Sequence, residues 1–121
     1  MPPKIFESEQ RFCRILWAHE PINSTALVML CKEQLGWSKA TTYTVIRRLS
    51  ERGVVKNEHA VVRSLVSRDE VRTAQADELM ARSFDGSLPA FLAAFLGGKT
   101  ISAEEAAELK RLIDAHEEGR A

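Results

Sequence analysis

The sequence predicts a mainly α-helical protein with a small β-hairpin, built as an N-terminal winged helix-turn-helix plus a C-terminal helical dimerisation arm. Three observations predict this class. A capped amphipathic segment near residues 39–52 carries a polar, basic outer face. Two short β-branched runs joined by a polar turn follow it directly, and a later segment, 88–96, is apolar almost all round. We therefore expect a winged-helix DNA-binding domain at 1–67 and a helical dimerisation domain at 68–121.

The capped segment is a candidate recognition helix. Ser38 is a suitable N-cap because its hydroxyl can accept from a free N–H of the first turn, and Gly53 can end the helix in the left-handed region. At about 100° per residue, one side of the helix forms a core stripe. This stripe consists of Thr42, Val45, Ile46 and Leu49. The opposite side carries Ala40, Tyr43, Thr44, Arg47 and Glu51, flanked by Thr41 and Arg48. Short side chains allow a close approach to base edges, and arginines reach guanines or phosphates. An ordinary amphipathic surface helix would show the same periodicity.

A wing is expected directly after this helix. Residues 54–56 and 61–66 read as strands, and Asn57 to Ala60 read as the turn between them. We expect the basic wing residues Lys56, His59 and Arg63 to contact the DNA backbone. A wing that only closes the fold is the alternative. His59 has no Cys or His neighbour at ligand spacing, so no metal is expected there.

Two helices precede the recognition helix. The first is expected from Ser8 to His19, before Pro21, which cannot continue a helix. The segment Asn23-Ser24-Thr25 offers N-caps for the second, which Gly36 ends. Free N–H groups at a helix start can hold a phosphate, so Asn23 and Ser24 join the DNA-binding candidates. Trp37 is expected as a core residue between the second and third helices.

The distribution of charged residues supports different roles for the two halves of the chain. Residues 1–66 carry ten Lys/Arg and six Asp/Glu, whereas residues 67–121 carry seven and eleven. This split is typical of a protein whose front half faces a polyanion, although chance variation in a neutral protein explains it too. The residues expected to contact DNA are Asn23, Ser24, Ser38, Lys39, Ala40, Thr41, Tyr43, Thr44, Arg47, Arg48, Lys56, His59 and Arg63.

The back half predicts three helices that assemble with a second copy. The first begins at Ser67 or Asp69 and runs to Phe84, the second is the apolar segment 88–96, and the third follows a capping box at Ser102 and Glu105. A helix that is apolar all round must be buried, and this one is too short to cross a bilayer. A two-fold dimer is the simplest way to bury it. The expected interface residues are Leu79, Met80, Phe84, Leu88, Phe91, Leu92, Phe95, Leu96, Leu109, Leu112 and Ile113.

Cysteine usage and targeting features indicate a cytoplasmic protein without membrane insertion. Cys13 and Cys31 lie in separate predicted helices without CxxC spacing, which favours reduced thiols over a disulfide. The N-terminus lacks the apolar stretch of a signal peptide. The three histidines show no catalytic or ligand spacing, and there is no Gly-rich phosphate loop or nucleophile elbow. We therefore expect no enzyme activity, no cofactor and no metal.

Several short motifs, taken in order, resemble the penicillinase repressor family of BlaI-, MecI- and CopY-type regulators. They are Ile15-Leu16-Trp17, Trp37-Ser38 followed by Thr41 and Thr44, Arg48-Leu49 before Gly53, Ser83-Phe84-Asp85-Gly86-Ser87-Leu88, and Phe95-Leu96. The resemblance implies a cytosolic homodimer that represses promoters through a winged helix. It also implies a DNA contact at Thr41. Ala40 and Tyr43 fall on other family contact positions but differ from the family's residues, which leaves the operator sequence open.

The same resemblance suggests how repression ends. In antibiotic-sensing members, a membrane sensor-protease leads to cleavage of an Asn-Phe bond in the apolar helix. The matching pair is Ala94-Phe95, of which Phe95 agrees and Ala94 does not. The candidate cleavage site is therefore Ala94-Phe95, and a membrane sensor-protease or its effector protease is a candidate partner. Copper-responsive members end in a cysteine cluster, and this chain has no cysteine after Cys31.

From these features together, we expect a sequence-specific transcriptional repressor that acts as a homodimer on near-palindromic double-stranded operators. The alternative is a winged-helix protein-interaction module without specific DNA binding. Salt dependence separates the two, because neutralising phosphates releases counterions and contact with a protein partner does not.

Overall fold

The computed structural model describes residues 3–119 and contains six helices and three strands in that range. The element order is α1 (Glu7–His19), β1 (Ile22–Asn23), α2 (Ser24–Leu35), α3 (Lys39–Glu51), β2 (Val55–Glu58), β3 (Val61–Ser64), α4 (Arg68–Phe84), α5 (Leu88–Leu96) and α6 (Ala103–His116). The chain forms two compact units, Met1–Glu78 and Leu79–Ala121, so the division falls within α4.

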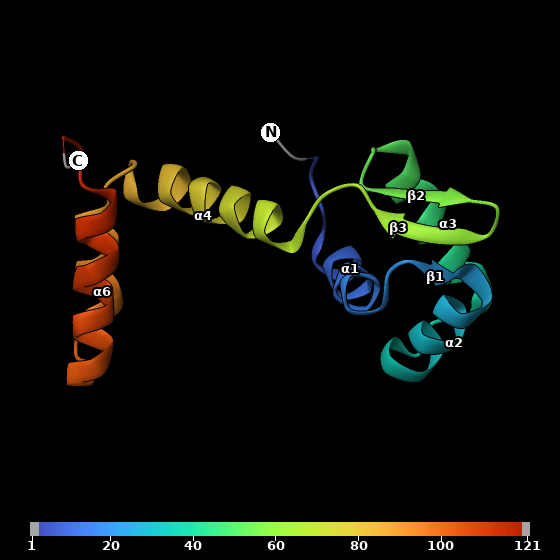
Figure 1. Cartoon of the computed structure of the whole chain (residues 1–121), viewed down its shortest axis with the longest axis horizontal. Helices are drawn as coiled ribbons and strands as arrows, with labels where there is room; N and C mark the ends of the chain where they lie inside the picture. The colour runs from blue at the N-terminus through green and yellow to red at the C-terminus, as the bar shows by residue number, and fades with distance from the viewer. Residues whose placement is uncertain (1–2, 120–121) are drawn as a thin grey trace. The chain divides into compact units, whose positions relative to one another are not determined.

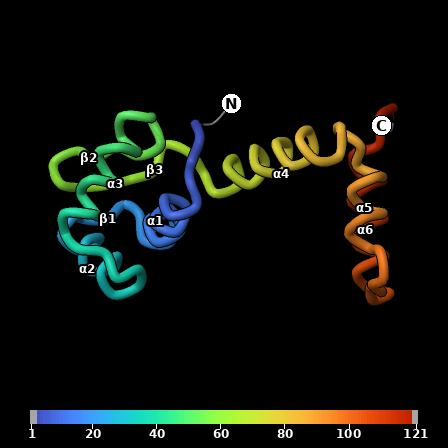
Figure 2. Tube along the Cα trace, turned by 180° about the vertical axis from the view of Figure 1, so that it is seen from behind, coloured from blue at the N-terminus to red at the C-terminus, as the bar shows by residue number. Residues whose placement is uncertain are grey.

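The first unit is a winged helix-turn-helix. Helices α1, α2 and α3 pack on one another and on a small antiparallel sheet of order β1-β3-β2 (Figure 1, and from behind in Figure 2). Its largest fully buried side chains come from all of these parts. They are Phe12, Leu16, Leu27, Leu49, Val54, Val55 and Val62. The predicted fold class is confirmed.

The helix ends agree with the capping residues in the sequence. The Asn23 side chain accepts from Thr25 N–H at 2.8 Å, and the Ser38 hydroxyl accepts from Thr41 N–H at 3.1 Å. Gly36 ends α2 with φ 70°, and Gly53 follows α3 with φ 77°. These left-handed positions suit glycine because it has no Cβ.

The hairpin turn is shorter than predicted. Asn57 and Glu58 pair with Val62 and Val61, so they belong to β2 rather than to the turn. The turn is His59-Ala60, with φ 53° and 62°. Two consecutive left-handed residues form the turn type whose twist matches that of the flanking strands, and this geometry favours the two-residue loop.

Strand β1 was not predicted from the sequence. Ile22 and Asn23 pair with Val62 and Val61, which adds a third strand at the edge of the hairpin. Two residues are too few to show the alternation that marks a strand. Asn23 therefore serves both as a strand residue and as the N-cap of α2.

The second unit contains α5 and α6. Ser87 caps α5 and Ser102 caps α6, each hydroxyl accepting from the N–H three residues on. Phe91 packs edge-on against Phe84, with ring centroids 5.4 Å apart, and stacks on Phe95 at 5.9 Å. No residue of α5 or α6 is buried in the single chain. Among residues 3–119, no helix has both the length and the apolar character to cross a membrane.

Candidate nucleic-acid interface

Helix α3 has the two-sided character that the sequence predicts. Thr42, Ile46 and Leu49 are buried, and Val45 is half-buried. The side chains turned away from the core are polar or short. Lys39, Ala40, Thr41, Arg47, Arg48 and Glu51 are exposed, and Tyr43 and Thr44 are half-buried. The exposed side of α3 therefore contains no large aliphatic residue that would oppose contact with DNA.

The two arginines on this side are only weakly engaged. Arg47 lies 3.5 Å from the Glu51 carboxylate, and both side chains are 64% exposed. Exposed pairs of this kind contribute only about 0–1 kcal/mol. Arg48 makes no ion pair with the residues that the structure describes. Both guanidinium groups are thus free to meet phosphate or base acceptors.

The start of α3 carries a small hydroxyl pair. The Ser38 hydroxyl donates to Thr41 Oγ1 at 3.0 Å while it accepts from the Thr41 N–H. Both residues are exposed, as are Lys39 and Ala40 between them. The cap fixes the Thr41 side chain at the outer surface of the first turn.

Ser24 and Tyr43 are brought together, which sequence reasoning did not anticipate. The Tyr43 hydroxyl donates to Ser24 Oγ at 3.2 Å, and Ser24 is only 4% exposed. The Ser24 N–H donates to Ala60 O at 2.8 Å. The Ser24 N–H and hydroxyl are therefore both bonded within the protein, and Ser24 links α2 to α3 and to the wing turn. Asn23, by contrast, is exposed.

The wing places its basic residues on its surface. Lys56 and Arg63 are directly paired across β2 and β3, so their side chains share one face of the hairpin. Lys56 Nζ lies 2.8 Å from the Glu58 carboxylate. The hydrogen bond and charge of Lys56, together with the charge of Arg63, lower the pKa of Glu58. His59 is exposed at the turn.

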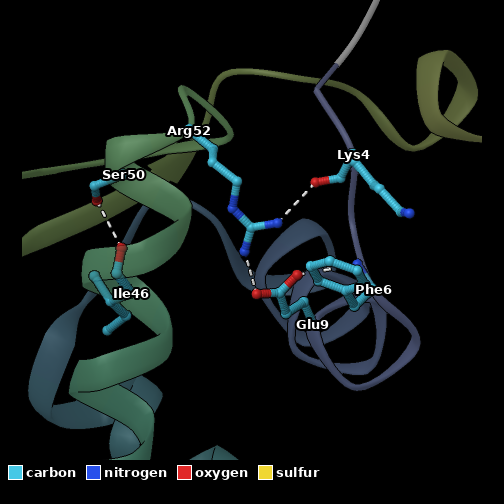
Figure 3. Close-up of polar contacts among 6 residues, drawn as sticks. All are labelled: Lys4, Phe6, Glu9, Ile46, Ser50 and Arg52. Carbon is cyan, nitrogen blue, oxygen red and sulfur yellow. Dashed lines mark hydrogen bonds and ion pairs between the residues drawn. The ribbon is translucent and has the colours of Figure 1, made fainter.

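A polar cluster fixes the C-terminal end of α3 to α1 (Figure 3). The Arg52 guanidinium donates to the Glu9 carboxylate and, at 3.0 Å, to Lys4 O. Glu9 is 6% exposed and also accepts from Phe6 N–H at 3.0 Å. A buried carboxylate needs such partners, because desolvation otherwise penalises its charge. Arg52 and Glu9 are 43 residues apart, so no local sequence pattern predicts that they form a pair.

The expected interface residues of the second half are exposed or half-buried in one chain, and none of them is fully buried. Leu79 is 45% exposed, and Leu88, Phe95, Leu112 and Ile113 are each 54% exposed. The others are half-buried: Met80, Phe84, Phe91, Leu92, Leu96 and Leu109. Ala94 and Phe95 are consecutive exposed residues of α5. Among the described residues, no group of three His, Cys, Asp or Glu side chains is placed to hold a metal ion.

A winged helix-turn-helix with this exposed polar helix defines the class of winged-helix DNA-binding transcription regulators. Residues 5–115 match the penicillinase repressor family, and the chain belongs to that family. The family is one of transcriptional repressors rather than enzymes. The penicillinase repressor of Bacillus licheniformis is 26% identical over 119 residues, covering 94% of this chain and 92% of that protein.

The fold is similar to a solved structure of the same family. This is the solution structure of the Bacillus licheniformis BlaI monomeric form in complex with the blaP half-operator. The two share a TM-score of 0.51 and 22% identity, over 58% of this chain and 90% of that one. The similarity concerns the fold. The BlaI structure, which was solved in complex with DNA, contains a winged helix of this kind.

Proposed function

We propose that this chain represses transcription by binding near-palindromic operators as a homodimer. The observation that carries the proposal is the division of α3 into a buried apolar stripe and an exposed side with two weakly engaged arginines. Such a helix fits the major groove, where base edges present distinct donor and acceptor patterns. Family membership and the operator complex of the BlaI structure support the same function.

Each part of the first unit has a proposed role. Arg47 and Arg48 contact guanines or phosphates, and Ala40, Thr41 and Thr44 lie against base edges. Ser38, Lys39 and Asn23 meet the backbone near the starts of their helices. The wing residues Lys56, His59 and Arg63 contact phosphates of the flanking backbone, whereas Ser24 and Tyr43 hold α2, α3 and the wing turn together.

The proposed dimer rests on the second unit. Helix α5 is composed of apolar residues and one proline, yet none of its side chains is buried in a single chain. Burial of each large apolar side chain contributes about 1.5–3 kcal/mol, so leaving this set in water is unfavourable. A second copy of the chain presents the same set and covers it through a self-complementary interface. Two joined winged units then read two half-sites.

Release by proteolysis is the finer part of the proposal. Ala94 and Phe95 are both exposed, and cutting between them divides α5 and removes α6 from the first unit. The agent is a sensor-protease of the membrane or a protease that it activates, acting on a repressor in the cytoplasm. Loss of the dimer weakens operator binding because the second half-site contact is no longer intramolecular.

Duplex binding by the intact protein tests the function. Its genomic sites are first located, and one such duplex is then titrated over a range of salt concentrations. A repressor gives a linear fall of log affinity with log salt, with a slope of about −0.9 per phosphate neutralised. Arg63→Ala should reduce that slope by about one unit without changing sequence preference. Salt-independent binding, or none, would instead favour the protein-interaction module.

A further inference from the structure

A polar groove between α1 and the first half of α4 is not used by the proposed DNA-binding surface. It consists of two adjoining clefts of about 470 and 350 Å³ that share Arg14, Trp17 and Arg68. Arg72 lines the second cleft only, and Glu20 the first. We call these clefts together the α1–α4 groove. None of its lining residues belongs to α3 or to the His59-Ala60 turn.

Three arginines line the groove, and within residues 3–119 none of them is engaged in an ion pair. Arg14, Arg68 and Arg72 are exposed and form no ion pair with other residues that the structure describes. Arg68 and Arg72 are four residues apart on α4, a spacing that puts them on one face of the helix. Arg14 faces the groove from α1. Guanidinium groups bind carboxylate and phosphate in a bidentate manner, so this arrangement is suited to anionic oxygen.

The acidic residues of the groove are confined to its first cleft. The Glu20 carboxylate accepts from Ser64 N–H at 2.7 Å and from the Ser64 hydroxyl at 2.8 Å. Asp69 lies in the first turn of α4, where its negative charge interacts favourably with the positive end of the helix dipole. The second cleft has no acidic lining residue: besides arginines and Trp17, it contains Gln10 and Gln75. An anionic group is therefore favoured in the second cleft.

The walls of the groove are held in place. Gln75 Nε2 donates to Gln10 Oε1 at 2.8 Å, which links α4 to α1 at one end. The Trp17 indole N–H donates to Val66 O at 3.0 Å, so the ring is fixed at the point that the two clefts share. The groove therefore has one rigid wall beside its guanidinium groups, and such a wall limits the positions that a bound ligand can take.

We infer that the α1–α4 groove binds a small polyanion with carboxylate or phosphate groups, and that this ligand is an effector of the repressor. The effector role rests on the proposed function. Arg14 belongs to α1, which lies entirely in the first unit. Arg68 and Arg72 belong to α4, which begins in the first unit and ends in the second. A ligand bridging them favours one arrangement of α1 and α4, and its differential affinity biases operator binding.

Calorimetric titration of the intact protein tests the site with pyrophosphate and with citrate, at constant ionic strength set by sodium chloride. We expect saturable binding of at least one probe. The double variant Arg14→Ala with Arg72→Ala should weaken it by about tenfold or more, since each 1.4 kcal/mol lost is a factor of ten. The control variant Arg11→Ala with Arg111→Ala removes the same charge outside the groove and should bind as the parent does. Thermal unfolding verifies that both variants fold.

Three results would overturn the proposal. They are the absence of saturable binding of either probe, equal weakening in the control variant, and a ligand-induced shift of the Trp37 indole N–H signal without one of Trp17 in nuclear magnetic resonance spectra. DNA phosphate is the other source of the same chemistry. If the groove variant lowers the salt slope of duplex binding when no probe is present, the arginines bind the DNA backbone and the effector site is wrong. If the parent binds the probe but no duplex, the proposed repressor function fails while the anion site stands.

Discussion

Tyr43 of α3 donates its phenolic hydrogen to Ser24 Oγ at the start of α2, 3.2 Å away, and Ser24 N–H in turn donates to Ala60 O of the wing turn. Three separate elements of the winged helix thus meet at one point. Tyr43 is half-buried, although most side chains on its side of α3 are exposed. The contact gives Tyr43 a positioning role that the helical pattern alone did not reveal.

Substitutions at these two residues should be coupled. Tyr43→Phe and Ser24→Ala each remove the same hydrogen bond, so each should lower the free energy of unfolding by about 0.5–1.5 kcal/mol. The double variant should lose less than the sum of the two single variants. Urea unfolding of the four proteins at one protein concentration measures this cycle. Additive losses would mean that the hydroxyl pair contributes nothing, and a Tyr43→Phe effect on DNA affinity alone would indicate a direct DNA contact.

Breaking the Arg52–Glu9 pair should destabilise the winged unit. Arg52→Ala leaves the buried Glu9 carboxylate with one fewer partner, and a charged hydrogen bond of this kind is worth roughly 1.5–3 kcal/mol. Glu9→Gln should cost less, because the amide oxygen can still accept from Phe6 N–H. Arg11→Ala is the matched control, since its pair with Glu7 has side chains 61% and 88% exposed. A loss for Arg52→Ala no larger than that of this control would contradict the role of the pair.

The buried thiol Cys13 should make stability depend on alkaline pH. Burial, with the charge of Glu9 adding to it, raises the pKa of Cys13 to about 12, from 9.0 for an ordinary thiol. Below pH 9 both states keep the proton, so this group has no effect. Above it the unfolded chain ionises first, and the free energy of unfolding falls by about 1.4 kcal/mol per pH unit until the folded pKa is reached.

Comparison with Cys13→Ala isolates this contribution from other groups that titrate in the same range. The difference in unfolding free energy between parent and variant should shrink as pH rises from about 9 towards 12. Native Cys13 should also react slowly with iodoacetamide at pH 8, because it is fully buried and its thiolate is scarce. Rapid alkylation of both cysteines in the folded protein would contradict this environment.

The elements that the sequence predicted well are those with local causes. The caps Ser38 and Ser102, the glycines after α2 and α3, and the buried stripe of α3 all follow from neighbouring residues. What the sequence did not predict depends on contacts between distant segments. Arg52–Glu9 joins residues 43 apart, and Tyr43–Ser24 joins residues 19 apart. Strand β1 exists only because β3 lies beside it. The DNA contacts themselves stay predictions, since they depend on a partner.

A charge in the apolar helix α5 should separate assembly from DNA recognition. Phe95 is 54% exposed in one chain and stacks on Phe91, so in the proposed dimer it lies at the interface. Phe95→Glu places a carboxylate in a surface that a second copy would otherwise cover, and an unpaired buried charge is strongly unfavourable. Residue 95 is exposed in one chain and glutamate is a good helix former, so α5 itself should persist. Thr100→Glu adds the same charge just beyond α5 and is the control.

Sedimentation and operator binding then decide together. We expect the parent and the control to be dimers at micromolar concentrations and the Phe95→Glu variant to be a monomer. The monomer should bind a single half-site as the parent does, because α3 and the wing are unchanged. It should bind the full operator more weakly, by a factor of about 10²–10⁴, since the second contact is no longer intramolecular. A Phe95→Glu variant that stays dimeric would remove α5 from the interface. A monomer that occupies the full operator at parental concentrations would show that repression does not depend on assembly.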